Sequence, residues 1–346
     1  MEKEIKILSA SRLKTLEDCA WEYWCQYVLK LPSKGNDGSA RGTACHLVFE
    51  VLLNERHRHH FDKITKENTI YTSPSIVKLV KKSLNRDGFY SEENLKMCND
   101  MILVGLNYDF YAKGGKVLCG EQEFLLESDD PEYKARGFID KPVKYKGGVI
   151  KLVDYKTSKN KKTPSELDGD YQSMMYSLAA KDLSAKKEAG WPKNVKKIVA
   201  EFLFLRFPDD PSQQVEASED QLKGFEHYLA DAYDKINNFD RDLATSNYAK
   251  DQPRSKDGSF CGPLKCGYAK QPGQLKKNGL PMYFCEYKFP FDYYILKDKN
   301  GKQMGSAMHP DFLLKKNESD TIEKKSYEGC PAHRYLFEEP KDAFDF

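Results

Sequence analysis

Residues 136–158 read RGFIDKPVKYKGGVIKLVDYKTS, and this stretch decides the predicted fold. It holds two apolar runs rich in β-forming residues, joined by a polar turn with two glycines, a pattern typical of a β-hairpin. Asp140 ends the first run, and Asp154 and Lys156 end the second. Residues two apart on a strand point to the same face, so we expect these charged side chains at one sheet edge. Two carboxylates and an ammonium placed together suit a divalent cation that promotes attack on a phosphate group.

The composition indicates a globular chain with a polar surface. Of its 346 residues, 40% are hydrophobic and 31% are charged, and the formal net charge is +2. This near-neutral balance does not by itself indicate nucleic-acid binding, for which a strongly basic chain would be the direct signal. Lysines cluster at 159–162 and 186–197, but such runs are most often solvated surface. We use them only as supporting observations.

The sequence also bears on the compartment of the protein. It has no apolar run of about 18 residues, which a membrane span requires. The N-terminal residues lack the apolar core of a signal peptide. We therefore expect a cytoplasmic protein that makes no contact with a membrane. The nine cysteines are an odd number, and in a reducing compartment they are more plausible as core residues or metal ligands than as disulfides.

Helical and strand-like patterns alternate along the first two thirds of the chain, which predicts an α/β fold. The predicted helices cover residues 11–30, 41–60, 170–181 and 218–237, and the predicted strands cover 117–126, the hairpin and the apolar run 197–207. Residues 55–115 are expected to form a helical insertion. The continuous apolar run at 197–207 is typical of a buried central strand.

The last third of the chain has a different character. From residue 238 onward it is rich in Lys, Asp, Gly, Pro and Tyr, and it contains four of the cysteines. Residues 293–304 predict a short hairpin with an Asn-Gly turn. We therefore predict a core over residues 1–237 and a cysteine-containing extension over residues 238–346 that packs on this core.

Four short motifs follow one another in this chain. They are Gly42-x-x-x-His46, Gly137-x-x-Asp140, Val153-Asp154-Tyr155-Lys156-Thr157 and Gln172-x-x-x-Tyr176. Together they resemble the PD-(D/E)XK nucleases, and specifically their RecB-like branch, which includes the nuclease domains of bacterial helicase–nucleases, CRISPR-associated adaptation exonucleases and many phage exonucleases. The resemblance covers about residues 11–207. It implies a restriction-endonuclease-like core, in which helices flank a mixed central sheet.

The resemblance implies metal ligands. Taken alone, His46 beside an apolar helical stripe is more often a packed or capping histidine, but in this branch the histidine at that place binds a metal. His46, Asp140 and Asp154 would then bind Mg²⁺ or Mn²⁺, with the carbonyl of Tyr155 as a further ligand. Carboxylate and carbonyl oxygens suit both ions.

The resemblance also implies catalytic roles. Lys156 would hold or deprotonate the attacking water, or stabilise charge in the transition state. Gln172 and Tyr176 would position DNA or the lysine. Glu123 matches an acidic position of some members, and we consider it either an auxiliary site residue or an ordinary exposed strand residue.

The cysteines suggest a second metal centre. RecB-like nucleases often carry a [4Fe–4S] cluster with one ligand near the N-terminus and three near the C-terminus of the nuclease domain. Cys19 matches the first position, and Cys261, Cys266 and Cys285 are candidates for the others, with Cys330 able to replace one. Their spacing departs from the compact trio of the family. Thiolates bind iron–sulfur clusters and zinc alike, so a [4Fe–4S] cluster, a structural Zn²⁺ and no metal all stay open.

The leading hypothesis is a metal-dependent deoxyribonuclease, and more specifically an exonuclease that acts in DNA recombination, repair or replication. Its expected partners are single-stranded DNA or duplex ends, together with recombination or replication proteins, in the cytoplasm of a bacterial or phage-infected cell. Two alternatives stay open. One is a structure-specific endonuclease, and the other is a non-catalytic DNA-binding protein that retains the nuclease fold.

Overall fold

The structure is a computed structural model of the chain, and it describes residues 6–251, 266–268, 270–277, 279, 281–315 and 317–337. The chain divides into two compact units. The first consists of Met1–Ala10 and Gly35–Asn237, and the second consists of Ser11–Lys34 and Asn238–Phe346. The division into a core over 1–237 and an extension over 238–346 stays a prediction.

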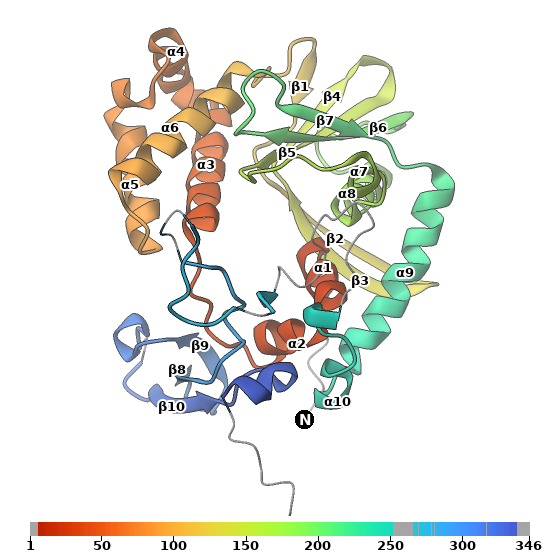
Figure 1. Ribbon diagram of the computed structural model, residues 1–346. Helices are drawn as coiled ribbons and strands as arrows, with labels where there is room; N and C mark the ends of the chain where they lie inside the picture. Colours follow the sequence, from red (N-terminus) through yellow and green to blue (C-terminus); the bar gives the residue numbers. More distant parts are fainter. Residues whose placement is uncertain are drawn as a thin grey trace, which may run out of the picture. The chain divides into compact units, whose positions relative to one another are not determined.

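The first unit alternates helices and strands (Figure 1). Its helices are α3 (Asp37–Leu53), α4 (Arg58–Glu67), α5 (Pro74–Arg86), α6 (Glu92–Asn107), α7 (Pro164–Asp168), α8 (Tyr171–Ala185) and α9 (Glu219–Asn237). Its strands are β1 (Gly115–Val117), β2 (Gln122–Asp129), β3 (Glu132–Ile139), β4 (Lys141–Tyr145), β5 (Val149–Lys156), β6 (Lys197–Phe204) and β7 (Ser212–Val215). Helices α4 to α6 occupy the stretch for which a helical insertion was predicted.

A mixed sheet with the strand order β1-β4-β5-β6-β7 lies at the centre of the first unit. Strands β4 and β5 pair antiparallel, whereas β5 and β6 pair parallel. A parallel pair needs a long crossover connection, and α7 and α8 lie within it. Most residues of β5 and β6 are buried, as expected for central strands. The predicted fold class, a mixed sheet flanked by helices, is confirmed.

The predicted hairpin is present as β4 and β5, but the first apolar run is broken at Asp140. Upstream of this residue, β3 pairs with β2 in a separate two-stranded sheet. The turn between β4 and β5 needs glycine at Gly148, where φ is +80° and a Cβ atom would lie 2.6 Å from the carbonyl oxygen of Asn194. Asp140 therefore lies where the chain passes from one sheet to the other.

Three of the predicted elements are interrupted in the structure. The single strand predicted over 117–126 is wrong, because β1 ends at Val117 and β2 begins at Gln122, with Glu121 in a left-handed conformation between them. The helix predicted over 11–30 is interrupted at Cys19, which begins a new helix. The helix predicted over 41–60 is interrupted at Asn54, whose backbone is extended between α3 and the elements that lead to α4. These breaks come from local backbone geometry that leaves little trace in hydrophobic periodicity.

Helices cover both faces of the central sheet. On one face, α3 and α6 share a buried apolar core with the side chains of Val153, Tyr155, Leu203 and Leu205. On the other face α8 packs against β6, and it also contacts β2. Phe49 of α3 stacks on Tyr155, with 4.2 Å between ring centroids, a contact of about 0.5–1.5 kcal/mol beyond its burial. This contact fixes α3 against the end of β5.

The second unit brings together distant parts of the chain. Its elements are α1 (Ala10–Asp18), α2 (Ala20–Tyr23), a π-helical turn (Trp24–Val28), α10 (Arg241–Ala244), β8 (Phe291–Lys297), β9 (Gln303–Ala307), β10 (Thr321–Tyr327) and a 3₁₀ segment (Pro331–Leu336). The strands form a sheet in the order β10-β8-β9. The hairpin predicted at 293–304 is confirmed as β8 and β9, whereas β10 was not predicted.

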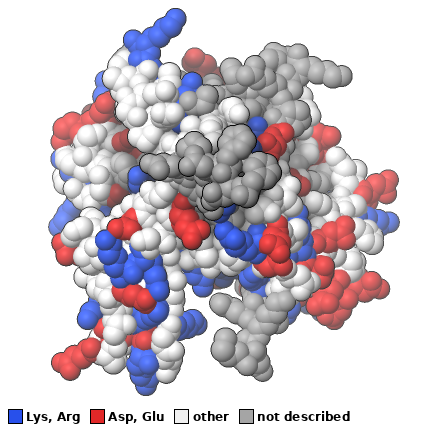
Figure 2. Space-filling view, turned by 60° about the horizontal axis from the view of Figure 1, so that its bottom comes forward, with Lys and Arg blue, Asp and Glu red and all other residues white. Residues whose placement is uncertain are grey.

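The surface carries both signs of charge. On the face in Figure 2, Lys and Arg side chains lie beside Asp and Glu side chains, in keeping with the near-neutral net charge. Among the helices that the structure describes, none combines the length and the apolar character that crossing a membrane would require.

Candidate active site

Asp154 lies near the end of β5 and is almost fully buried, with 3% of its surface exposed. Gln172 Nε2 donates a hydrogen bond to its Oδ1 atom at 2.7 Å, and the Tyr176 hydroxyl lies 2.9 Å from the same oxygen. The other oxygen, Oδ2, is buried and accepts no hydrogen bond of ordinary angles from the described residues, although the Lys156 ammonium lies 2.6 Å from it. The protein therefore holds one oxygen by hydrogen bonds and the other by an ion pair.

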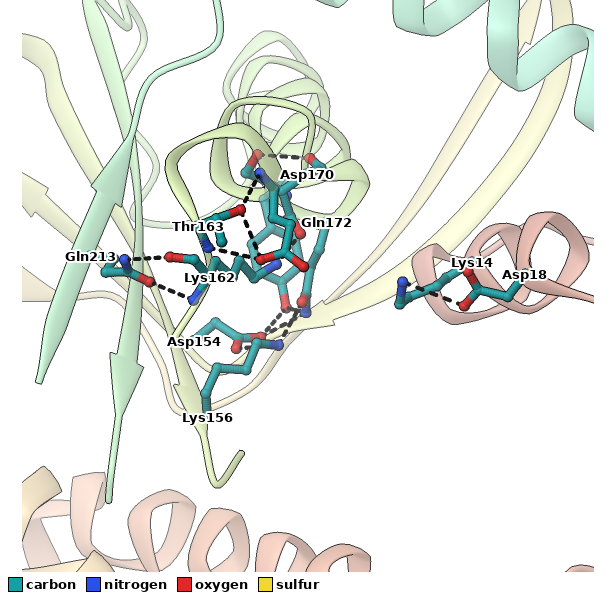
Figure 3. A network of polar contacts seen from close by, with 12 residues as sticks. Lys14, Asp18, Asp154, Lys156, Lys162, Thr163, Asp170, Gln172 and Gln213 are labelled. Atoms are coloured by element: carbon teal, nitrogen blue, oxygen red, sulfur yellow. Dashed lines mark hydrogen bonds and ion pairs between the residues drawn. The ribbon is translucent and has the colours of Figure 1, made fainter. Parts of the chain in front are cut away.

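Lys156 extends from the same face of β5 as Asp154 (Figure 3). Its ammonium lies 2.6 Å from Asp154 Oδ2 as an ion pair, and it donates to Gln172 Oε1 at 2.6 Å. Burial lowers the pKa of Lys156, but the nearby carboxylates of Asp154 and Asp140 outweigh burial, and the pKa lies above the ordinary lysine value. In this state the side chain is an ammonium that can donate hydrogen bonds.

Helix α8 supplies both polar partners of Asp154. Gln172 and Tyr176 are four residues apart and so share one helical face. The Gln172 amide bridges two groups, because its oxygen accepts from Lys156 and its nitrogen donates to Asp154. Gln172 Nε2 also donates to the Tyr176 hydroxyl at 2.7 Å. The sequence predicted these two residues at the site, and the structure brings them to Asp154 and Lys156.

Asp140 and His46 form a second set of contacts beside β5. Asp140 Oδ2 accepts a hydrogen bond from the Tyr155 amide at 2.8 Å, and its Oδ1 lies 3.2 Å from His46 Nδ1. His46 Nε2 lies 2.8 Å from the Tyr155 carbonyl oxygen. With an acceptor at each ring nitrogen, the imidazole is arranged as a doubly protonated cation. His46 therefore touches two of the three groups with which it was predicted to share a metal, the carboxylate of Asp140 and the carbonyl of Tyr155.

The packing of α3 explains how His46 reaches this place. A Cβ atom on Gly42 would lie 3.2 Å from Thr157 Oγ1, so the glycine allows α3 to approach the end of β5 closely. Residue His46 is one helical turn further along α3. The Gly-x-x-x-His spacing thus has a structural cause. Gly42 lets α3 approach the end of β5 closely, and His46, four residues later on the same helical face, then reaches the site.

The electrostatics of this set are tightly linked. Burial and the charge of Asp154 raise the pKa of Asp140, although the contact with His46 opposes them. Burial lowers the pKa of His46, but the bonded carboxyl of Asp140 outweighs burial and raises it to about 9. Asp140 and Asp154 therefore lie close together, and the protonated imidazole of His46 offsets part of their negative charge.

Two carboxylates, an imidazole and a backbone carbonyl are a chemically suitable donor set for Mg²⁺ or Mn²⁺. The buried Oδ2 atom of Asp154, which the Lys156 ammonium contacts as an ion pair, is an oxygen of the type that binds such an ion. Among the described residues, however, no group of three or more His, Cys, Asp or Glu side chains is arranged as a ready-made metal site. Metal binding here would require His46 to exchange its proton for the ion.

Comparison with known proteins places the chain in a family. The family model of the PD-(D/E)XK nuclease superfamily matches residues 7–269. The chain belongs to this superfamily. The resemblance predicted from the four sequence motifs is confirmed.

Curated relatives of this nuclease superfamily member include ATP-dependent helicase/deoxyribonuclease subunits from two streptococci. The Streptococcus mutans protein is 27% identical over 165 residues, and the Streptococcus uberis protein is 30% identical over 154 residues. Each match covers 44% of this chain but only 14% of the relative. A solved structure from Eubacterium rectale, described as a candidate exonuclease, is 12% identical and covers 68% of this chain and 83% of its own, with a TM-score of 0.42. That TM-score is too low to carry an argument.

Glu123 is the one acidic candidate that the structure leaves apart from the other site residues of this nuclease. It lies on β2 with its side chain exposed, and no hydrogen bond or ion pair links it to the described site residues. Its role stays a prediction. Glu121, which sequence reasoning passed over, lies nearer, because its amide donates to the carbonyl of Asp140 and burial and the Glu50 charge raise its pKa. Its left-handed backbone had no signal in the sequence.

Four cysteines of the second unit line one cavity. They are Cys19, Cys266, Cys285 and Cys330, and Lys288, Tyr287 and His333 share the lining. Cys261, which was predicted as a ligand, lies outside the described residues. Cys330, which the sequence offered as a replacement for one of the predicted ligands, is among the cysteines that line the cavity.

The chemistry of this cavity is that of buried thiols. Burial raises the pKa of Cys266 to about 11 and that of Cys330 to about 12, and it also raises that of Cys285. The hydroxyl of Tyr287 and Nδ1 of His333 are buried there, and the residues that the structure describes supply no hydrogen-bond partner for either atom. Buried polar groups normally have partners, so these orphaned atoms fit a group that the cavity binds. The four sulfurs do not themselves form a ready-made metal site among the described residues.

Proposed function

We propose that this protein is a metal-dependent deoxyribonuclease. The observation that carries the proposal is the state of Asp154, with one oxygen held by Gln172 and Tyr176 and the other buried and ion-paired with the ammonium of Lys156. Such an arrangement is costly for folding alone, because it takes a carboxylate and an ammonium out of water. It is useful for a site that must accept a cation and a phosphate group.

In this proposal Asp140, Asp154, His46 and the carbonyl of Tyr155 hold Mg²⁺ or Mn²⁺. The ion, when bound, supplies Lewis acidity toward the phosphate group and toward water. Lys156 donates hydrogen bonds to the attacking water or to a phosphate oxygen and stabilises the charge that develops there.

The remaining residues of the proposed site act by orientation. Gln172 holds Lys156 and Asp154 in a fixed relation, and Tyr176 restrains the Oδ1 atom of Asp154. Glu123 is kept as an auxiliary candidate.

The substrate and the mode of cleavage are also proposals. The matched relatives are deoxyribonuclease subunits, which supports DNA as the substrate. The RecB-like resemblance supports an exonuclease that acts in recombination, repair or replication, with DNA ends or single strands as its substrate. The chain spans 14% of the length of these relatives, and assembly with a partner protein is likewise proposed.

We further propose that the cysteine cavity holds a [4Fe–4S] cluster through Cys19, Cys266, Cys285 and Cys330. Soft thiolates are the usual ligands of such clusters, and the number of sulfurs matches. The cluster would take the place of the protons on these thiols and link the start of the chain to its last third. Structural Zn²⁺ is the alternative with the same ligands.

Cleavage of end-labelled linear DNA, single-stranded and duplex, in Mg²⁺, Mn²⁺ or EDTA tests the nuclease proposal. Lys156→Met should lower the rate by about 10²–10³-fold, as expected when a transition-state donor is lost. Lys151→Met is a matched control, since Lys151 is on the same strand, pairs with Glu201 and is similarly buried, but faces the other side of the sheet. Cleavage by the wild type in EDTA, or equal loss in both variants, would overturn the proposal.

Closed circular DNA separates the two modes of cleavage. An exonuclease leaves covalently closed circles intact while it degrades the same DNA once linearised. Nicking of the closed circle by the wild type, with Lys156→Met inactive, would replace the exonuclease proposal with that of an endonuclease.

Anaerobic purification followed by a visible absorption spectrum and iron and zinc analysis tests the cluster. A brown protein with about four irons is expected. Cys330→Ser should lose most of the iron, whereas Cys261→Ser should keep it. A colourless protein with stoichiometric zinc would refute the iron–sulfur assignment.

A further inference from the structure

Residues 157–163 connect the end of β5 to α7, and Lys162 fixes this connection at two points. The first is its backbone. The Lys162 amide donates to Gln213 Oε1 at 3.0 Å, and Gln213 Nε2 donates to the Lys162 carbonyl at 2.9 Å (Figure 3). One side-chain amide on β7 therefore holds both polar backbone groups of Lys162, much as a neighbouring strand would.

The second point is the Lys162 side chain, which forms an ion pair with Asp170 Oδ2. Asp170 is the N-cap of α8, because its Oδ1 accepts a hydrogen bond from the Ser173 amide at 2.8 Å. One oxygen of the Asp170 carboxylate therefore caps α8, and the other pairs with the Lys162 ammonium. Both side chains of the pair are mostly buried, so the pair is less screened by solvent than surface ion pairs.

Lys162 also lies close to Lys156. Its ammonium is 4.3 Å from the centroid of the Phe202 ring, and the Lys156 ammonium is 5.4 Å from the same centroid. Two lysines, one aromatic ring and one carboxylate therefore form a compact group beside the predicted catalytic residues.

These contacts form a continuous connection from β7 to the site. Gln213 holds Lys162, Lys162 holds Asp170, and Asp170 begins the helix on which Gln172 lies two residues later. Gln172 in turn contacts Lys156 at 2.6 Å. The first turn of a helix is its least constrained part unless a cap fixes it, so the position of Gln172 depends on Asp170.

We propose that Lys162 is a positioning residue of the nuclease reaction, which fixes the N-terminus of α8 through Asp170 and thereby holds Gln172 against Lys156. This inference rests on the proposed nuclease function. Catalysis depends on the placement of reacting groups to within fractions of an ångström, and a misplacement of about 1 Å can cost about 10²-fold in rate. Loss of the Lys162 charge would leave Asp170 largely buried and unpaired, and the helix start would shift.

A direct contact between Lys162 and a DNA phosphate is the competing role for this lysine. It predicts a different result, since a phosphate contact contributes to binding and to its salt dependence. A positioning residue instead affects the rate of the bound complex. The separate measurement of kcat, KM and DNA affinity therefore distinguishes the two roles.

Lys162→Met and Lys161→Met are the two variants to compare. Lys161 is the neighbouring residue, with 21% of its side chain exposed against 22% for Lys162, but it pairs with Asp210 instead. We expect Lys162→Met to lower kcat by about 10–100-fold while KM and the DNA dissociation constant change less than about twofold. Lys161→Met should change none of them, and Lys162→Arg should recover most of kcat. Weaker DNA binding by Lys162→Met with kcat unchanged would overturn the proposal.

Asp170→Asn gives a second test, because asparagine caps a helix about as well as aspartate but cannot form the ion pair. It should reproduce the kcat loss of Lys162→Met, and the double variant should be no worse than either single variant. Additive losses would mean that Lys162 does not act through Asp170, and would overturn the proposal.

Hydrogen exchange measures the same effect without activity. The backbone amides at the start of α8 should exchange at least about fivefold faster in Lys162→Met than in the wild type or Lys161→Met, because the capped turn opens more often. Unchanged exchange would overturn the positioning role. A wild type that cleaves no DNA in any metal would instead overturn the proposed function, while the exchange result still decides whether Lys162 holds the helix.

Discussion

Asp154 and Glu201 are buried carboxylates on neighbouring strands of the same sheet, each with 3% of its surface exposed. The polar groups that surround them are different. Glu201 of β6 pairs in register with Val153 of β5. Paired residues of adjacent strands share a face, so Glu201 and Asp154 point to opposite faces of the sheet.

Glu201 is surrounded by donors. Its Oε1 atom accepts from Ser212 Oγ and Gln214 Nε2, both at 2.7 Å, and from the Tyr108 hydroxyl at 3.3 Å. Lys151 lies 3.3 Å from its Oε2 atom. At Asp154 the ion pair is closer, with the Lys156 ammonium 2.6 Å from Oδ2, and Gln172 and Tyr176 contact Oδ1. Both buried carboxylates therefore have polar partners, and they differ in their neighbours, because Asp154 lies beside a second carboxyl group, that of Asp140.

The largest expected effect is a crossed result for the two carboxylates. Asp154→Asn should lower kcat per folded molecule by about 10³-fold or more, equivalent to about 4 kcal/mol, and should also lower stability because Lys156 loses its buried partner. Glu201→Gln should keep kcat per folded molecule but lower the free energy of unfolding by about 2–4 kcal/mol, because Lys151 loses its buried partner. Denaturant unfolding and cleavage rates on the same preparations check both. Equal loss of kcat in the two variants would break the comparison.

The lysines on the two faces of the sheet also differ, because their pKa values shift in opposite directions. Whereas the pKa of Lys156 is raised, burial lowers the pKa of Lys141, on the Glu201 face, to about 8. In the unfolded chain this lysine keeps its ordinary pKa of 10.5, so between about pH 8 and pH 10.5 the unfolded state binds more protons. The cost of Lys141 to stability is therefore full below about pH 8 and disappears as the pH rises to about 10.5.

Lys141→Met removes that cost. The free energy of unfolding of the variant minus that of the wild type should fall by about 3 kcal/mol between pH 7.5 and about 10.5, from a shift of 2.5 pH units at about 1.36 kcal/mol each. Denaturant unfolding at several pH values measures this difference, and the subtraction cancels other groups that titrate in both proteins. A difference that stays constant with pH would show that Lys141 is charged in the folded protein throughout this range.

The smallest effect is expected for the tyrosines. Tyr176→Phe removes one of the two groups at Oδ1 of Asp154 while Gln172 remains, so kcat should fall by about 5–10-fold, or about 1 kcal/mol. Tyr108→Phe is the counterpart on the Glu201 face and should leave kcat unchanged. Steady-state cleavage rates decide, and a larger kcat loss in Tyr108→Phe than in Tyr176→Phe would contradict the division of roles.

Part of the candidate site could be predicted from spacing along the chain, whereas His46, Gln172 and Tyr176 became candidates through the resemblance to the nuclease family. Asp154 and Lys156 are two apart on one strand, and Gln172 and Tyr176 are four apart on one helix. Simple periodicity puts each pair on one face, and the crossover from β5 to α8 brings the faces together. For these four residues, spacing along the chain was enough to predict which side chains share a face.

The parts that escaped prediction depend on pairing between distant residues. Glu201 lies inside an apolar run, and nothing near it indicates that Ser212 and Gln214 on the next strand would neutralise it. The position of Asp140 between two sheets depends on which strand β3 pairs with. The choice of Cys330 is likewise made by tertiary packing, which hydrophobic periodicity does not encode.

The grouping of residues 11–34 with residues 238–346 has a consequence for biosynthesis. The indole of Trp21 donates to the Tyr327 hydroxyl across 306 positions of sequence. At about 5–20 residues per second, the ribosome adds Tyr327 about 15–60 s after Trp21. During this interval the stretch 35–237 is completed, while the aromatic segment that precedes it lacks its packing partners. The packing of the second unit is therefore completed only after its last strand, β10, has been synthesised.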